Sequence, residues 1–289
     1  MPITESGGLG AAITPEQWAT FVLEHLTAQS VVLASGATRI DTLNRQIHVP
    51  RVLSSGGADW FSELDPITET GPTGDDLVLS MKKVAALVTL SSEAVDDSNP
   101  SVLDTVGTAM TRAVALKADA GILNGPGGKA PVGVYGQAGG HVVSAGITID
   151  ALIDASGQIA AVGGSARAAY LNPADITALM KSKDLQERPL LGPDYVGGPT
   201  STVYGLTLWS TPAIAAGTGL VADPSQIIVA VRSDPSVAVS QDALFTSDGQ
   251  IARVIARLDC GVNDPAGLVS IAATTREGEE SPTTSRSSK

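Results

Sequence analysis

Hydrophobic residues recur at helical spacing through one long stretch of the chain. Between residues 99 and 124 the apolar positions follow one another at steps of three and four: Val102, Val106, Ala109, Ala113, Leu116, Ala120 and Leu123. This spacing predicts a helix with one apolar face, which begins at the capping residue Asn99 with Pro100 in the first helical position. A helix of this length exceeds the average of about 11–12 residues, so we expect it to be the structural spine of the protein.

Other segments have the composition of strands. Residues 45–53 alternate polar and apolar side chains around Pro50, which cannot donate to a sheet, so an edge strand is predicted. Residues 77–91 are rich in β-branched side chains and predict one further strand. More strands are expected at 131–135, 167–171, 206–209, 227–231, 237–240, 249–257 and 268–273, and helices at 148–162 and after the cap Asn172. The irregular order of helices and strands predicts an α+β fold rather than a doubly wound sheet.

A long polar stretch separates the first two strands and predicts a projecting hairpin. Between Val52 and Met81 there is no Lys, Arg or His, and the acids are Asp59, Glu63, Asp65, Glu69, Asp75 and Asp76. Two interpretations stay open: a solvated acidic loop, or an arm that binds a basic surface on a neighbouring subunit. The adjacent aromatic residues Trp60 and Phe61 favour the second, because leaving them both in water is costly.

Composition narrows the classes of protein that fit. The chain has 289 residues, of which 43% are hydrophobic, and 18 Lys and Arg stand against 30 Asp and Glu, for a net charge of −12. A whole-chain nucleic-acid binder usually has the opposite sign. The single cysteine, Cys260, excludes an intrachain disulfide framework and is expected to be a small buried apolar residue. The first residues lack a secretory signal, and no apolar run is long enough to span a membrane.

Catalytic motifs do not form a consistent set. The segment 124–131, NGPGGKAP, lacks the first glycine and the final Ser or Thr of a phosphate loop and follows a helix instead of preceding one. The segment 217–222 matches a loose dinucleotide pattern, but Asp223-Pro224 interrupts the helix that would hold a pyrophosphate. Neither GxSxG nor HExxH occurs. We therefore expect no catalytic residue, no cofactor and no metal site.

The stretch from Leu90 to Val134 resembles the major capsid proteins of tailed double-stranded DNA phages, which have the Hong Kong 97-type fold. The resemblance rests on Asp96-Asp97 before the long helix, on Asp119 with Ile122-Leu123-Asn124-Gly125 at its end, and on the strand Pro131-Val132-Gly133-Val134. Outside this stretch, Tyr170-Leu-Asn172-Pro173 and the segment 205–212 resemble further steps of that fold in the correct order. The resemblance covers roughly residues 10–275.

This resemblance implies a domain organisation. An N-terminal arm would span 1–35, and a peripheral domain 36–132 plus 237–263, including an extended loop at 46–83 and the spine helix at 99–124. An axial domain would span 133–236 plus 264–275, and a polar tail 276–289. The function implied is that of a structural major capsid protein of the virion. It would assemble in the host cytoplasm through hexamers and pentamers into an icosahedral head that encloses double-stranded DNA.

The resemblance also suggests where subunits meet. Trp60, Phe61, Glu63, Asp65 and Glu69 in the hairpin are expected to lie on a neighbouring subunit, and Arg253 and Arg257 are the acceptors suggested by charge. Some family members join a loop Lys to an Asn of another subunit with a Glu nearby. The corresponding positions here are Asp65, Asp248 and Ile255, so we expect no such cross-link.

Partners follow from the same resemblance. Beyond copies of itself, the chain would meet portal and scaffold proteins, a possible cement protein, and packaged DNA without sequence-specific contacts. Because it starts at Met1 close to the arm, we expect any scaffold to be a separate protein. Two alternatives remain: an encapsulin-type shell that packages protein cargo, and a monomeric α+β enzyme whose site has no familiar motif.

Overall fold

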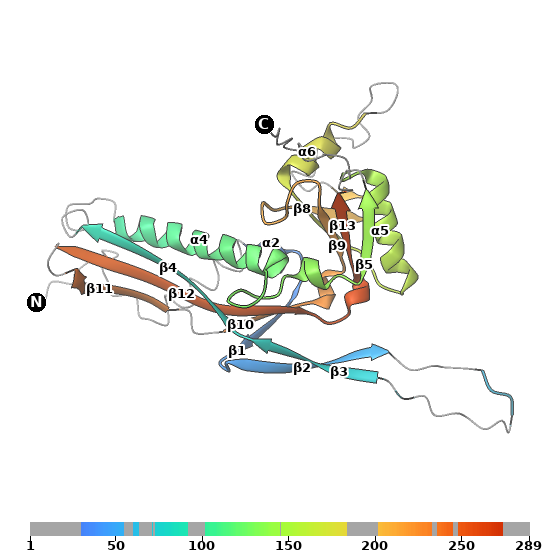
Figure 1. The fold of residues 1–289 in the computed structure, drawn as a ribbon, viewed down its shortest axis with the longest axis horizontal. Coiled ribbons are helices and arrows are strands. Elements are labelled where there is room, and N and C mark those ends of the chain that lie inside the picture. The colour runs from blue at the N-terminus through green and yellow to red at the C-terminus, as the bar shows by residue number, and fades with distance from the viewer. Residues whose placement is uncertain are drawn as a thin grey trace, which may run out of the picture.

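The computed structural model describes residues 30–54, 60–63, 71, 73–91, 102–144, 146–183, 202–232, 236–244 and 248–273. These residues form two β-sheets, a long helix and a projecting two-stranded hairpin (Figure 1). The mixture confirms the predicted α+β class. Most of the predicted N-terminal arm and all of the polar tail at 276–289 lie outside the described residues.

The five-stranded sheet is built around β12 (Gly249–Val262), a strand of 14 residues. β12 pairs antiparallel with β10 (Ile227–Arg232), with β11 (Ser236–Leu244) and with β4 (Lys82–Ser91). β10 in turn pairs in parallel with β1 (Thr38–Thr42). The predicted strand at 249–257 is therefore correct in place but shorter than the strand observed.

The predicted spine helix is α4 (Val102–Asn124), which lies along one face of this sheet (Figure 1). The apolar face predicted for it is wrong, because Ala109, Ala113 and Leu116 are exposed. Successive side chains of a strand point to opposite faces. The buried core beneath α4 therefore takes every second residue of β12, and it consists of Met110, Val114, Ala118 and Ile122 of the helix with Ala252, Val254, Ala256, Leu258, Cys260 and Val262 of the strand. Cys260 is buried, as the sequence predicts.

The six-stranded sheet has the order β5-β13-β9-β6-β8-β7. Its strands are β5 (Gly140–Ser144), β13 (Leu268–Ala273), β9 (Gly219–Ala222), β6 (Ala168–Leu171), β8 (Leu206–Ser210) and β7 (Thr202–Val203). Helix α5 (Ile149–Ala161) packs on one face and α6 (Pro173–Met180) follows β6. The other face contributes Ala168, Tyr170, Leu220 and Ala222 to the core beneath α4, so one apolar cluster joins both sheets.

The predicted strand at 131–135 is wrong. Val132 forms only an isolated bridge with Pro126, and the chain then enters the short 3-10 helix η1 (Val134–Gln137). The cause is a tight turn, in which the Gly133 amide donates to the Gly125 carbonyl at 2.9 Å. A Cβ atom on Gly133 would lie 2.4 Å from the Gly125 nitrogen, so the two backbones meet more closely than any side chain allows.

The single strand predicted at 77–91 is in fact two strands, β3 (Thr73–Ser80) and β4, which belong to different sheets. They separate at Met81, whose amide donates to the Arg45 carbonyl at 3.0 Å. Strands β1, β5, β7 and β9 were not predicted. β10 falls inside the predicted axial range yet pairs with β12, and the predicted domain boundaries stay a prediction.

Short elements complete the fold: α2 (Val31–Ala34), η2 (Pro224–Gln226) and η4 (Pro265–Gly267). Among the described residues, no helix combines the length and the apolar character needed to cross a bilayer.

The close contact at Gly133 gives a first prediction. Gly133→Ala should lower the free energy of unfolding by about 3 kcal/mol, because the new methyl group overlaps backbone that cannot move aside. The control is Gly136→Ala, where an added Cβ meets no atom within 4 Å. Urea unfolding of both variants measures the difference, and equal midpoints would show that the turn is not constrained in this way.

Candidate assembly interface

The hairpin of β2 (Gln46–Ser54) and β3 projects away from both sheets (Figure 1). Its root is held by apolar side chains from both strands, Ile47, Val49, Leu77 and Leu79, which pack on Ile228 and Ala230 of β10. This contact covers part of the sheet face opposite α4. Pro50 lies in β2 without disrupting it, because the ribbon is only two strands wide.

Two residues of β12 allow the hairpin root to approach the sheet. A Cβ on Gly261 would lie 2.8 Å from Leu77 and 2.9 Å from Leu79, so a larger residue would push the hairpin away. The neighbouring Asp259 carboxylate accepts from the Ser80 amide at 2.7 Å, where the chain passes from the hairpin to β4. Burial raises the pKa of Asp259, and the backbone donors oppose that shift.

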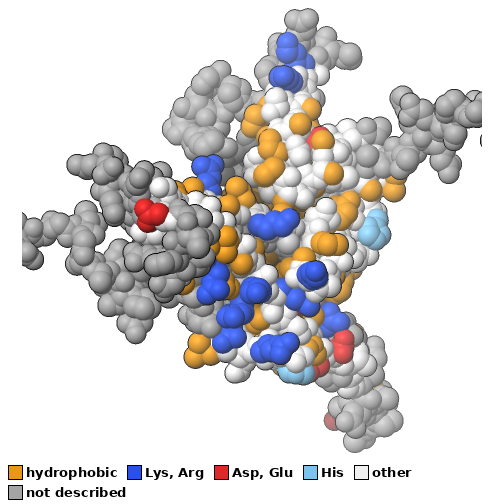
Figure 2. All heavy atoms as spheres, turned by 60° about the vertical axis from the view of Figure 1, so that its left-hand side comes forward, with side chains coloured by type: hydrophobic (Ala, Val, Ile, Leu, Met, Phe, Trp, Pro, Cys, Tyr) orange, Lys and Arg blue, Asp and Glu red, His pale blue; other side chains and the backbone are white. Residues whose placement is uncertain are grey.

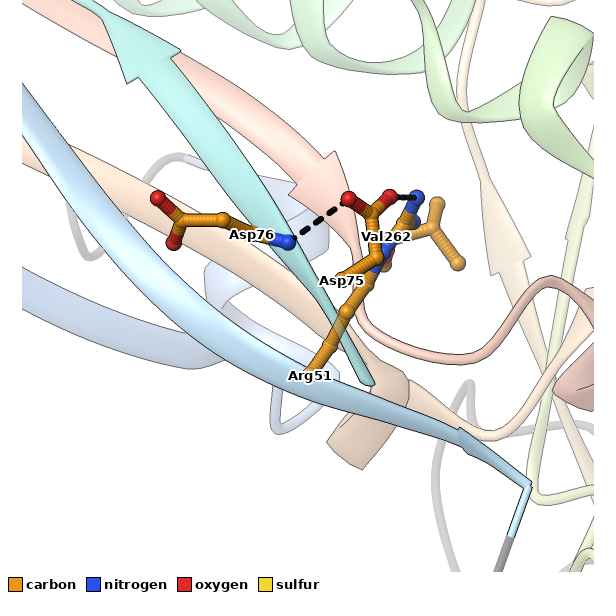
Figure 3. A network of polar contacts seen from close by, with 4 residues as sticks. All are labelled: Arg51, Asp75, Asp76 and Val262. Carbon is orange, nitrogen blue, oxygen red and sulfur yellow. Dashed lines mark hydrogen bonds and ion pairs between the residues drawn. The ribbon is translucent and has the colours of Figure 1, made fainter. Parts of the chain in front are cut away.

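Arg51 ties the hairpin to the end of β12 (Figure 3). Its Nη2 donates to Asp75 Oδ2 on the facing strand at 2.8 Å, and its Nη1 donates to the Val262 carbonyl at 3.2 Å. The Asp76 amide donates to the other oxygen of Asp75 at 2.8 Å. The hydrogen bond from Arg51 is the main reason that the pKa of Asp75 is lowered.

The described part of the hairpin tip is apolar and exposed. The Trp60 side chain is fully exposed at 104%, and Phe61 is 41% exposed. Glu63 is exposed beside them. Asp65 and Glu69, the other hairpin residues predicted to reach a neighbour, lie outside the described residues.

Arg253 and Arg257 lie on the same face of β12, opposite α4, because residues four apart in a strand point the same way. The register places Leu87 opposite Arg253 and Lys83 opposite Arg257 on β4. Lys83 is exposed and Leu87 is 60% exposed. We call this surface of Lys83, Leu87, Arg253 and Arg257 the basic face. Lys83 and Leu87 were not predicted as part of it. The alternation of exposed and half-buried side chains along β4 could have revealed them.

The hairpin root adjoins the basic face, but β2 and β3 lead away from it. In Figure 1 the hairpin points to one side of the molecule, whereas the free ends of β4, β11 and β12 point to the other. A contact between the hairpin tip and Arg253 therefore needs two copies. Asp248, at the turn into β12, has a positive φ of 45°, and Ile255 lies on the same face as the two arginines.

A second polar network holds the start of the described chain. Asp119 of α4 is 2% exposed and accepts from the Ser30 hydroxyl at 2.5 Å and the Val31 amide at 2.8 Å. Ser35, at the end of α2, bonds to the Tyr170 hydroxyl of β6. The network joins the last residues of the predicted arm to both the spine helix and the six-stranded sheet. Burial raises the pKa of Asp119 against the opposing effect of these hydrogen bonds.

The described residues hold no group of three or more His, Cys, Asp or Glu side chains that could bind a metal ion. Basic side chains are conspicuous on the face drawn in Figure 2, with few acidic ones among them. The exposed aromatic tip on its fixed hairpin root and the basic face are two separate surfaces, each suited to binding another protein chain.

Comparison with known proteins gives a consistent result. The family described as "Phage capsid family" matches residues 10–272. A curated relative, the major capsid protein of Klebsiella oxytoca phage phiKO2, is 24% identical over 139 residues, which are 48% of this chain. The matched region is 32% of that relative, so it spans about a third of its length.

Solved structures resemble the whole fold. A chain described as Mycobacterium phage Adephagia has a TM-score of 0.70 at 18% identity, with 84% of this chain and 89% of that chain covered. A chain from the "Capsid of native GTA particle computed with C5 symmetry" has a TM-score of 0.69 at 20% identity, with the same coverage of 84% and 89%.

The Arg51 contacts predict a loosened hairpin when they are removed. In Arg51→Ala, hydrogen exchange of the amides in β2 and β3 should accelerate, because the root loses its bonds to Asp75 and to the Val262 carbonyl. The control is Arg45→Ala, which removes an exposed arginine at the base of the same hairpin.

The same bond predicts a dependence on pH. Because the pKa of Asp75 is lowered, the bond is present at neutral pH and is lost as the pH falls below 3.8. The exchange rates of the natural protein and of Arg51→Ala should therefore become similar in acid. Unchanged exchange in Arg51→Ala at neutral pH would contradict this role.

The Asp119 network predicts a different dependence on pH. Asp119→Ala should cost about 1–3 kcal/mol of unfolding free energy, because it leaves the Ser30 and Val31 donors without their acceptor. A raised pKa in the folded state means that ionisation of Asp119 opposes folding. The stability of the natural protein relative to Asp119→Asn should therefore decline as the pH rises from below 3.8 through the raised pKa. Thermal unfolding across this range measures the trend, and an opposite slope would show that the hydrogen bonds outweigh burial.

Proposed function

This chain belongs to the phage capsid family, and from that membership we propose that it is the major capsid protein of a phage head. Copies of it would assemble through hexamers and pentamers into an icosahedral shell that encloses double-stranded DNA. Such rings form by contacts between unlike surfaces of neighbouring subunits, repeated until the ring closes. The role is structural and needs no catalytic residue.

The exposed hairpin is the observation that supports this proposal most directly. It is a projecting ribbon with a rigid root and a fully exposed Trp60, which has no structural purpose in an isolated chain. The same molecule carries a basic face from which its own β2 and β3 lead away. We propose that the acidic hairpin of one subunit crosses the basic face of the next.

The remaining partners follow from the role of a head protein. We propose that a portal protein, a scaffold protein and possibly a cement protein contact the assembled shell, which becomes part of the virion. Packaged DNA would touch the shell without sequence-specific contacts. The net charge of −12 suits that role, because a lining that gripped phosphates would hinder dense packing.

An encapsulin-type shell is the alternative with the same fold, and it is not favoured. The matching family and the curated relative are both phage capsid proteins. Electron microscopy of the purified full chain tests the proposal. Closed shells, or rings of five or six, are expected, with particles competent to enclose DNA. Monomers that persist after candidate scaffold proteins are added would overturn it.

The pairing of hairpin and basic face gives a prediction for assembly. Asp65→Lys with Glu69→Lys should reduce the yield of shells by about ten-fold or more, because repulsion replaces attraction at a contact repeated in every ring. The control, Asp150→Lys with Asp154→Lys, makes the same change of net charge on exposed positions of α5. Adding Arg253→Glu and Arg257→Glu to the hairpin variant should restore part of the yield. Assembly that is unaffected by the hairpin variant would count against the pairing.

A further inference from the structure

A hollow of about 370 Å³ lies where the C-terminal end of α4 meets the start of β4 and the turn at residues 125–131. Its walls are mainly small or apolar, with Ala118, Ala120, Gly121, Pro131, Ala213 and Leu258 among them. The volume falls within the range of about 300–1,000 Å³ in which proteins bind groups the size of small molecules. An apolar group rather than a bare ion therefore suits its interior.

Lysines from three segments line this hollow. Lys117 comes from α4, Lys129 from the turn, and Lys82 and Lys83 from the first residues of β4. None of the described residues that line the hollow is acidic. Outside the lining, burial raises the pKa of Asp259, and the charge of Lys82 opposes that shift. An occupant that combines an apolar body with negative charge matches both the walls and the rim.

The hollow is continuous with the basic face. Lys83 lines the hollow and also stands opposite Arg257 on the face of the sheet that carries Arg253. Because Lys82 and Lys83 point to opposite sides of the edge of β4, the positive charge runs from the sheet face around that edge into the hollow. A segment that crosses the basic face can therefore continue into the hollow.

One segment of this chain has the matching chemistry. The hairpin tip reads Asp59-Trp60-Phe61-Ser62-Glu63, which places two aromatic rings between two carboxylates. Trp60 is fully exposed in its own chain, so its ring is available to another copy. An indole ring buries about 150–250 Å² when it is enclosed, and lysine ammonium groups bind favourably over its face.

We propose that the hollow receives the Trp60 side chain from a second copy of this chain, with the lysine rim binding the carboxylates on either side of it. The inference rests on the proposed function and specifies which part of the neighbour the hairpin tip enters. The occupant must be another copy, because the hairpin of the same chain projects away from its own body (Figure 1). Trp60 would then be the central anchor of the contact and the lysines its polar rim.

A cross-linking experiment on assembled particles tests the proposal. Full-length chains carrying Ser62→Cys and Ala130→Cys are assembled and treated with a short bis-maleimide linker. Ser62 lies beside the anchor and Ala130 lines the hollow, so chains linked in series are expected on a denaturing gel. The comparison pair, Ser62→Cys with Tyr204→Cys, places the second thiol between β7 and β8 on a side chain that is 77% exposed and does not line the hollow, and it should not link. The natural Cys260 does not compete, because it is buried and its burial raises the pKa of the thiol.

A second pair of variants tests whether Trp60 enters the hollow or the hairpin tip only passes near it. Ala120→Phe fills the hollow and should lower the cross-linked fraction about ten-fold or more, as expected when an anchor residue loses its pocket. Ala113→Phe places the same ring on an exposed turn of α4 and should leave the fraction unchanged. Thermal unfolding of both variants confirms that each chain is folded.

The outcomes are distinct. Shells that form without the Ser62–Ala130 link, or that link equally well in Ala120→Phe, overturn this inference and leave the proposed function standing. Failure of the unmodified chain to form shells, tested as above, overturns the proposed function and this inference with it. A labelled DNA duplex that binds the natural protein but not Lys117→Glu with Lys129→Glu would assign the hollow to phosphate groups, and that result also overturns the inference.

Discussion

The fold depends on the pairing of β12 with three other strands. Along its length of 14 residues, β12 bonds to β4 on one side, and to β11 and then β10 on the other. One face packs under α4, while the other carries the hairpin root at one end and the basic face at the other. A strand that serves so many neighbours has little freedom in its sequence. Side chains that face α4 must alternate along the whole of β12 with side chains that face away from it. Position 261 must be occupied by a residue as small as glycine, because Leu77 and Leu79 cross the strand there.

Patterns confined to one segment could be predicted from the sequence. The end of α4 at Asn124 agrees with the prediction, whereas the predicted start at Asn99 lies outside the described residues. The predicted apolar face of α4 was wrong, because a stretch rich in Ala offers several faces of similar spacing, and the sheet covers the one with Met110, Val114 and Ala118. The cap Asn172 is confirmed, since its side chain accepts from the Ala174 amide at 3.0 Å. Pairings between distant segments could not be predicted. Met81 separates two strands only because Arg45 offers its carbonyl there, and nothing local in residues 77–91 marks that break. Short strands such as β9, with all four residues buried, have no alternation that would distinguish them from other apolar runs.

The candidate interface also has a part that could be predicted from local sequence and a part that depends on contacts between distant segments. The acidic hairpin with its aromatic pair is visible in the sequence because composition alone makes it unusual. The surface it is proposed to bind is assembled from β4, β12, α4 and the turn at 125–131, which meet only after folding. Their positive charge was the reason for predicting Arg253 and Arg257 as acceptors of the acidic hairpin. The pairing of β4 with β12 adds Lys83 and Leu87 to this surface. The hollow could not have been foreseen, since Lys82 and Lys83 of β4 lie 34 or more residues before Lys117 of α4 and approach it only in the folded chain.

The junction between the two sheets has a consequence for how such subunits fill rings of different size. β12 passes into β13 through η4 alone, and this link is held by backbone bonds from Asn263 to Gln226 and from Gly139 to Pro265, both at 2.8 Å. The apolar cluster runs unbroken from α4 to the underside of the six-stranded sheet, so bending at the junction would open the core. The hairpin root is also held in place, by Arg51 and by apolar packing on β10. Under the proposed function, the angle between five-fold and six-fold neighbours would then be accommodated at the contacts between chains rather than by bending within one chain.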